Sequence, residues 1–85
     1  MAKIVMYFRD SCPYCRRAES VLVKKGVTGI EKLYPDDDDA LKREMVERTG
    51  RTTVPQIFID GKHVGGCDDL LSLDRRGGLD PLLAA

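Results

Sequence analysis

Two cysteines three positions apart are the residues of this chain best placed to do chemistry. The segment Cys12-Pro13-Tyr14-Cys15 follows an apolar stretch and opens a stretch with helical periodicity. Proline is favoured at the first helical position, so the pattern predicts Cys12 at the N-cap and Cys15 one turn into the helix. Residues at i and i+3 share a helix face, which allows the two sulfur atoms to come within disulfide distance. The pair is therefore suited to thiol–disulfide exchange.

The helix start also predicts different roles for the two thiols. Unpaired backbone N–H groups and the helix dipole at an N-terminus favour the thiolate, which is the nucleophilic form of cysteine. We therefore expect Cys12 to be the attacking thiol at neutral pH. Cys15 is predicted to lie deeper and to keep its proton, so that it acts as the resolving thiol.

Length and composition predict one small domain that spans residues 1–85. Apolar residues make up 42% of the chain and tryptophan is absent, so aliphatic side chains must fill the core. The 14 basic and 14 acidic side chains balance, which argues against nucleic acid as a partner. The sequence has no apolar run of membrane-span or signal-peptide length, and its cysteine count is odd. We therefore expect a cytoplasmic protein with no membrane partner. We also expect a monomer.

Hydrophobic periodicity predicts the elements that position the cysteines. The predicted strands are 4–8, 30–34, 56–59 and 62–65, and the predicted helices are 13–25, the segment between the acidic run 36–39 and Gly50, and 67–75. A helix joins the first two strands, which predicts a parallel pair, and Asp60-Gly61 predicts a tight antiparallel hairpin. The fold class is therefore α/β, a mixed four-stranded sheet flanked by three helices in the order β-α-β-α-β-β-α.

Two stretches of the sequence carry little regular pattern. The acidic run 36–39 is expected to cap the helix that follows it, because carboxylates stabilise a helix N-terminus. The run lacks the glycine and the spaced ligands of a calcium loop. Residues 79–85 are expected to form a partly docked tail whose anchors are Leu82 and Leu83.

Three segments of the chain together resemble those of a known family. They are Cys12-Pro13-Tyr14-Cys15, Thr53-Val54-Pro55 and Gly65-Gly66-Cys67-Asp68-Asp69-Leu70. A lone C-x-x-C also occurs in zinc ribbons and thioredoxins, whereas three such segments in this order are specific. The chain resembles a dithiol glutaredoxin of the small bacterial kind, which implies a thioredoxin-like fold. It lacks the tryptophan before the first cysteine and the Gly-Pro between the cysteines that are typical of thioredoxins.

The resemblance implies an enzyme that uses glutathione to reduce protein disulfides and protein–glutathione mixed disulfides. It assigns Cys12 as the nucleophile and Cys15 as the resolving thiol, with glutathione as co-substrate and with no metal or tightly bound cofactor. The implied partners are glutathione and proteins that contain disulfides or are glutathionylated. The implied glutathione-binding residues are Arg9, Tyr14, Thr53, Val54, Pro55, Gly66, Cys67, Asp68 and Asp69.

Glutathione is a short extended peptide with two carboxylates and one amine, so its site needs a backbone edge, cations and an anion. The resemblance implies that Pro55 is cis and that the backbone of Val54 pairs with the cysteinyl part of glutathione. Arg9 is the candidate for the glycyl carboxylate. The γ-glutamyl end is expected at the start of the third helix, with Asp69 preferred over Asp68, although either aspartate is also suited to capping that helix.

Three alternative interpretations remain open at this point. The side chains of Cys12, Cys15, Cys67 and His63 are acceptable ligands for a structural metal, but the helix start favours redox chemistry. A second alternative is a carrier that holds an iron–sulfur cluster between two protomers with glutathione. A third is a thioredoxin-like reductant recycled by a flavoprotein reductase. Outside such sites, Cys67 is expected to be a small packed residue without a catalytic role, and His63 is expected to face solvent.

Overall fold

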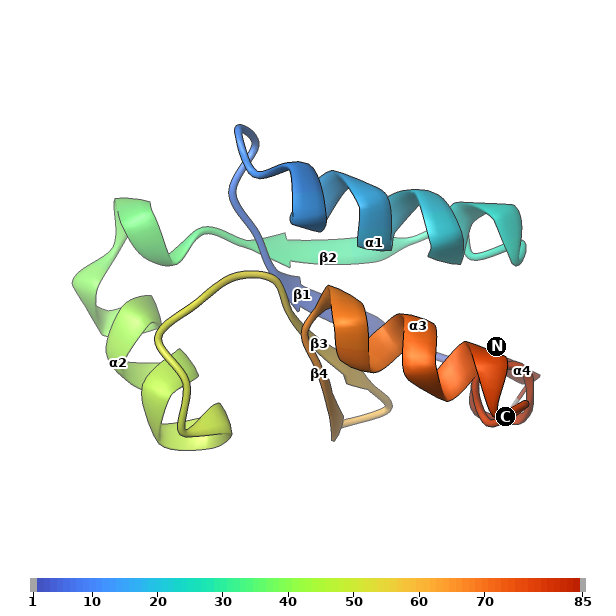
Figure 1. The fold of residues 1–85 in the computed structure, drawn as a ribbon. Coiled ribbons are helices and arrows are strands. Elements are labelled where there is room, and N and C mark those ends of the chain that lie inside the picture. The colour runs from blue at the N-terminus through green and yellow to red at the C-terminus, as the bar shows by residue number, and fades with distance from the viewer. Residues whose placement is uncertain (1, 85) are drawn as a thin grey trace.

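The computed structural model describes residues 2–84 as a four-stranded sheet with helices on both faces (Figure 1). In chain order the elements are β1 (Ile4–Tyr7), α1 (Pro13–Lys24), β2 (Ile30–Leu33), the 3₁₀ turn η1 (Pro35–Asp37), α2 (Asp39–Thr49), β3 (Gln56–Ile59), β4 (Lys62–Gly65), α3 (Cys67–Arg75) and α4 (Leu79–Ala84). No helix within residues 2–84 has the length and apolar character needed to cross a bilayer.

The sheet has the strand order β2-β1-β3-β4. Strand β1 runs parallel to β2 and antiparallel to β3, and β3 and β4 form an antiparallel hairpin. Asp60 and Gly61 in the hairpin turn have φ values of 50° and 81°, as a type I′ turn requires. The predicted mixed four-stranded sheet is confirmed. Strands β2 and β4, whose apolar patterns are weaker than those of β1 and β3, lie at the two edges of the sheet.

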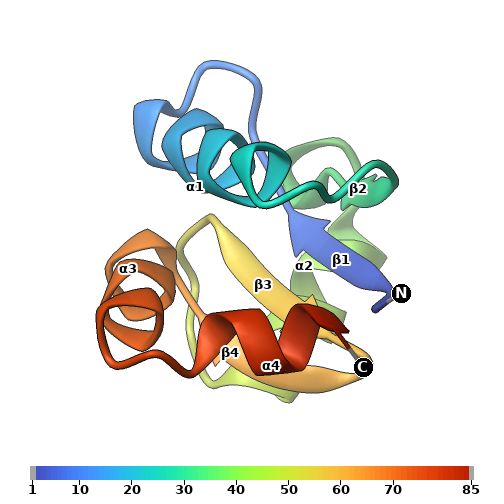
Figure 2. The ribbon, with the colours of Figure 1, turned by 90° about the vertical axis from the view of Figure 1, so that its right-hand side faces the viewer.

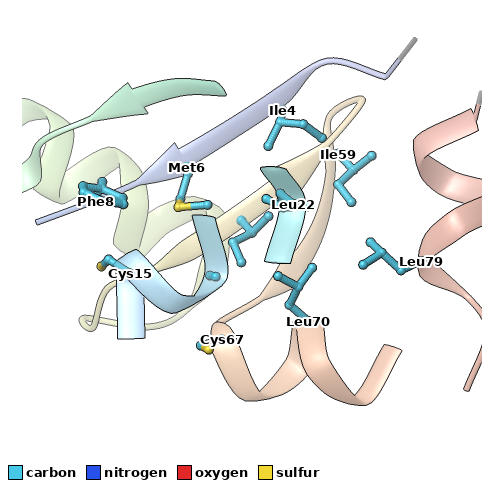
Figure 3. Packing of buried hydrophobic residues seen from close by; sticks show 11 residues of the cluster. Ile4, Met6, Phe8, Cys15, Leu22, Ile59, Cys67, Leu70 and Leu79 are labelled. Atoms are coloured by element: carbon cyan, nitrogen blue, oxygen red, sulfur yellow. The ribbon is translucent and has the colours of Figure 1, made fainter. Parts of the chain in front are cut away.

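Alternation along β1 divides the buried side chains between the two faces of the sheet. Helices α1 and α3 cover one face of the sheet and α2 covers the other (Figures 1 and 2). Ile4 and Met6 pack with residues of α1 and α3, whereas Tyr7 packs with Met45 of α2. The larger cluster, shown in Figure 3, consists of Ile4, Met6, Phe8, Cys15, Ala18, Leu22, Ile57, Ile59, Cys67, Leu70 and Leu79. Cys15 and Cys67 belong to this cluster, so the core fixes the start of α1 and the start of α3.

Capping residues set the ends of the first two helices. Helix α1 begins at Pro13, directly after Cys12, and Gly26 follows its end with φ of 93°. Helix α2 begins after Asp38, whose side chain accepts a hydrogen bond of 2.8 Å from the N–H of Ala40. It ends at Gly50, which adopts the left-handed conformation. The predicted capping role of the acidic run is therefore confirmed at Asp38.

The C-terminal prediction is wrong, because residues 79–84 form helix α4 and bring the number of α-helices to four. Leu79 is fully buried and extends from α4 toward Leu70 and Ile59 (Figure 3), whereas Leu82 and Leu83 are half-buried. A helix of six residues is too short to show an apolar period, and it contains a proline that is tolerated only in a first turn. The main anchor of this segment is therefore Leu79.

Candidate functional site

Cys12 and Cys15 lie at the start of α1, as the sequence predicts. Cys12 is the N-cap residue in an extended conformation, and Pro13 takes the first helical position. The Sγ atom of Cys12 accepts a hydrogen bond of 3.3 Å from the backbone N–H of Cys15. The N–H of Cys12 itself donates to the carbonyl of Arg9 at 3.1 Å, which closes the turn before the helix. A backbone donor and the helix N-terminus thus stabilise negative charge on the Cys12 sulfur.

The two thiols differ in access to solvent. Cys15 is fully buried, whereas Cys12 is half-buried, and both are free thiols. Burial raises the pKa of Cys15 to about 12, and its hydrogen bond with Cys12 acts in the same direction. Cys15 therefore keeps its proton at neutral pH, and Cys12 presents the accessible sulfur of the pair.

The loop before β3 lies beside the Cys12 sulfur. The Val54–Pro55 peptide bond is cis, as the family resemblance implies, and Pro55 is buried. The Sγ atom of Cys12 lies 3.9 Å from the carbonyl oxygen of Val54. This contact brings together two segments that are 42 residues apart in the chain.

A surface groove of about 200 Å³ borders this loop. All of the predicted glutathione-binding residues except Arg9 line it, together with two residues that the sequence did not single out. The lining residues are Tyr14, Arg51, Thr53, Val54, Pro55, Gln56, Gly66, Cys67, Asp68 and Asp69. A larger hollow of about 450 Å³ is lined only by residues of α2 and contains none of the predicted site residues. The groove beside Cys12 is therefore the candidate binding site.

The two aspartates at the start of α3 have different partners. The Oδ2 atom of Asp69 accepts a hydrogen bond of 2.9 Å from the N–H of Gly66 and lies 2.7 Å from Nη1 of Arg51. The Arg51 guanidinium, followed by the Gly66 N–H, lowers the pKa of the Asp69 carboxyl. Asp68 is exposed, and its carboxylate has no hydrogen bond or ion pair with any residue in 2–84. Asp69 thus caps α3, and Asp68 leaves its carboxylate available to a ligand.

Glycines allow β4 and α3 to meet tightly at this end of the groove. Gly65 has φ of +121°, and a Cβ atom there would lie 2.3 Å from Oδ2 of Asp69. A Cβ atom on Gly66 would lie 3.4 Å from the carbonyl oxygen of Pro55. The glycine pair therefore permits the Asp69 cap and its close approach to the loop.

The arginine that lines the groove is Arg51, whereas the sequence predicts Arg9. Arg9 lies outside the groove lining and forms a two-point ion pair with Asp36, in which Nη2 and Oδ1 are 3.2 Å apart. Arg51 instead lines the groove. In the sequence, Arg51 could have been proposed as a site residue because it is a cation two residues before Thr53, a predicted site residue. A signal for Gln56 is a polar residue at the start of an otherwise apolar strand.

The proposed metal ligands do not come together. Within residues 2–84, no group of three or more His, Cys, Asp or Glu side chains is arranged to hold a metal ion. His63 is half-buried, contrary to the expectation that it faces solvent, and its Nε2 atom lies 2.8 Å from Oε1 of Gln56. Cys67 is 4% exposed, and burial raises the pKa of its thiol, consistent with a packed residue.

Comparisons with known proteins identify the family of this chain. The glutaredoxin family model matches residues 4–64. Glutaredoxin 3 of Escherichia coli (strain K12) is 57% identical over 83 residues, which cover 98% of this chain and 99% of that protein. A glutaredoxin of Pseudomonas aeruginosa is 47% identical over the full length of both chains, 85 residues.

The fold of this chain also resembles the solved structures of glutaredoxins. The crystal structure of a buckwheat glutaredoxin–glutathione complex has a TM-score of 0.88 and 32% identity, and the match covers 98% of this chain and 77% of that chain. The solution structure of glutaredoxin from Brucella melitensis has a TM-score of 0.83 and 47% identity, with coverage of 98% and 89%. The chain therefore belongs to the glutaredoxin family of thiol–disulfide oxidoreductases, and its fold is thioredoxin-like.

Proposed function

We propose that this protein uses glutathione to reduce protein disulfides and protein–glutathione mixed disulfides through Cys12 and Cys15. The observation that carries the proposal is the position of the Cys12 sulfur. It accepts a backbone hydrogen bond at the start of α1 and lies 3.9 Å from the Val54 carbonyl oxygen, beside the groove. A nucleophilic sulfur next to a free peptide edge suits a substrate whose reacting sulfur is part of a short extended peptide.

Reduction of a protein–glutathione mixed disulfide needs only Cys12. The Cys12 thiolate attacks the sulfur of the glutathionyl group, and the target protein leaves as a thiolate that takes a proton from solvent. The new bond joins Cys12 to glutathione. The thiolate of a second glutathione then attacks the glutathionyl sulfur, which releases Cys12 and forms glutathione disulfide.

Reduction of a protein disulfide needs both cysteines. Cys12 attacks one sulfur of the target and forms a mixed disulfide with it, while the other target sulfur leaves as a thiolate. Cys15 then displaces the target and forms the Cys12–Cys15 disulfide, which two glutathione molecules reduce in turn. Burial holds Cys15 as a thiol, with a pKa of about 12, so its proton leaves as it attacks and is taken up by the departing target thiolate.

The groove offers a partner for each end of glutathione. The backbone of Val54 provides the peptide edge, and Thr53 and Tyr14 form walls of the groove. The start of α3 and the unpaired carboxylate of Asp68 are suited to the γ-glutamyl carboxylate and amine. The guanidinium of Arg51 is suited to the glycyl carboxylate, and Arg9 is a second candidate if it leaves Asp36.

The remaining parts of the proposal concern the state of the protein. We propose a single domain over residues 1–85, because every strand within residues 2–84 belongs to one sheet, and we propose that this domain acts as a monomer. The free thiols and the odd number of cysteines suit a reducing compartment such as the cytoplasm. Glutathione enters as a co-substrate, and no tightly bound cofactor is required by the steps above.

The proposal is tested with a small glutathione mixed disulfide, glutathione, glutathione reductase and NADPH. We expect turnover by the wild-type protein, retention of that turnover in Cys15→Ser and its loss in Cys12→Ser. Absence of wild-type turnover would refute the dependence on glutathione. Replacement of glutathione and its reductase by thioredoxin reductase separates the two recycling systems, because turnover only with thioredoxin reductase would support the thioredoxin-like alternative.

A further inference from the structure

A buried glutamine connects the groove loop to strand β4. Apart from tyrosine and cysteine, Gln56 is the only polar residue within 2–84 that is buried, with 1% of its surface exposed. Its Nε2 atom donates to the carbonyl oxygen of Thr53 at 3.0 Å, and its Oε1 atom lies 2.8 Å from Nε2 of His63. The His63 ring packs against Phe58, with 5.0 Å between ring centroids. Gln56, His63 and Phe58 thus contact one another in series, and Gln56 links this series to the loop at Thr53. We call these contacts the support of the loop.

The chemistry of these groups fixes every proton in the chain of hydrogen bonds. The Thr53 carbonyl can only accept, so the amide nitrogen of Gln56 must face it and the amide oxygen must face His63. His63 must then donate from Nε2. Burial, followed by Arg51 and Arg48, lowers the pKa of His63, so its ring is neutral at pH 7 and carries its proton on Nε2.

This support determines where the next backbone donor points. The carbonyl of Thr53 and the N–H of Val54 belong to one planar trans peptide group, so they point in opposite directions. Because Gln56 holds the carbonyl toward the protein interior, the N–H of Val54 is turned away from the interior. That N–H has no hydrogen-bond partner within residues 2–84, and both Thr53 and Val54 line the groove.

We propose that Gln56 and His63 are positioning residues that hold the Val54 N–H in the orientation needed to bind the peptide backbone of a glutathionyl group. This inference rests on the proposed function, because the proposed function is what assigns the glutathionyl group to the groove. Neither side chain reacts with the substrate. Their effect is on the affinity for the glutathionyl group, and the chemistry at Cys12 is left unchanged.

The orientation of the peptide group is tested by NMR without any substrate. We expect ¹⁵N shifts of neutral His63 protonated at Nε2, and a displaced Val54 amide cross-peak in Gln56→Met and His63→Phe. The first variant keeps the length of the side chain but removes both hydrogen bonds of the Gln56 amide, and the second keeps the ring on Phe58 but removes the hydrogen bond from His63 to Gln56. His63→Gln can donate to Gln56 and is expected to restore the wild-type Val54 cross-peak. An unchanged Val54 cross-peak in both disruptive variants would overturn the proposal.

The effect on binding is tested with an unreactive ligand, S-methylglutathione, and with turnover of a glutathione mixed disulfide. In Gln56→Met and His63→Phe, we expect the ligand to lose its hydrogen bond with the Val54 N–H. Loss of one hydrogen bond raises the Kd and the KM about two- to tenfold, and kcat should stay within about twofold of wild type. Val5→Ala is the matched control, because Val5 packs beside Phe58 on the same face of the sheet and its side chain has no hydrogen-bonding group. We expect its KM to equal that of wild type.

The outcomes separate the two proposals. If the wild-type protein neither binds S-methylglutathione nor turns over the mixed disulfide, the proposed function fails, while the Val54 cross-peak still tests the support by Gln56. If wild type is active and the disruptive variants keep the wild-type KM, or if Val5→Ala raises KM equally, the positioning role is wrong.

Discussion

Gly65→Ala is expected to damage the α3 end of the groove through one close contact. The added Cβ atom would lie 2.3 Å from Oδ2 and 2.7 Å from Cγ of Asp69. Asp69 would then have to leave the position from which it caps α3 and pairs with Arg51. The substitution therefore combines a backbone cost with the loss of a helix cap.

The size of the effect follows from these two contributions. Gly65 has φ of +121°, and holding an alanine in such a sparsely populated conformation costs about 1–3 kcal/mol. Loss of an N-cap hydrogen bond costs about 1 kcal/mol. The Arg51–Asp69 pair is almost half exposed, so it adds little. We therefore expect the free energy of unfolding to fall by about 2–4 kcal/mol.

Urea denaturation measures this change, and the chain provides two matched controls. Gly77 has φ of +77° with open space around its Cα, so Gly77→Ala reports the backbone cost alone. Gly29 has neither a left-handed φ nor a close neighbour, so Gly29→Ala is expected to lie within about 1 kcal/mol of wild type. Only Gly65→Ala should also raise KM for a glutathione mixed disulfide. If its unfolding free energy and KM match those of Gly77→Ala, the reasoning about the Asp69 contact is refuted.

Three further predictions concern charge and packing. Arg51 lowers the pKa of Asp69 below 3.8, so the carboxylate contributes stability above about pH 4 that is lost as the pH falls further. The difference in unfolding free energy between wild type and Asp69→Asn should therefore be larger at pH 7 than in acid, and a constant difference in urea titrations would contradict this. Arg51→Gln should raise KM for a glutathione mixed disulfide about tenfold and more than Arg9→Gln does, whereas the reverse order in steady-state kinetics would favour Arg9 as the carboxylate ligand. Leu79→Ala should destabilise the fold by about 2–5 kcal/mol and Leu82→Ala by less than half as much, and equal urea midpoints would contradict the anchoring role of Leu79.

Local signals explain why most of the fold could be predicted from the sequence. Cys12 and Pro13 mark the start of α1, Gly50 marks the end of α2, and Asp60-Gly61 marks the hairpin. Each of these residues acts through its own backbone conformation or its nearest neighbours, so its effect can be predicted without the fold. Leu79 was missed because its burial depends on the packing of α4 against elements far away in the chain.

The site was predictable to the extent that it depends on neighbouring residues. The N-cap position of Cys12 follows from the proline after it, and the greater depth of Cys15 follows from helical spacing. The pairing of Arg9 with Asp36 joins residues 27 apart, and that of Arg51 with Asp69 joins residues 18 apart. Such pairs form only after the strands and helices have assembled, so the pairing of each arginine with its aspartate could not be predicted from local patterns.

The central claim is that Cys12 is the thiol that receives the glutathionyl group from a mixed disulfide. The most direct test is to mix Cys15→Ser with a glutathionylated peptide, quench with acid and locate glutathione by mass spectrometry after trypsin digestion. Cleavage after arginine and lysine places Cys12 in peptide 10–16 and Cys67 in peptide 63–75, so the two positions are resolved. We predict glutathione on peptide 10–16 alone and none in Cys12→Ser. Glutathione on peptide 63–75, or on neither peptide, would contradict the account.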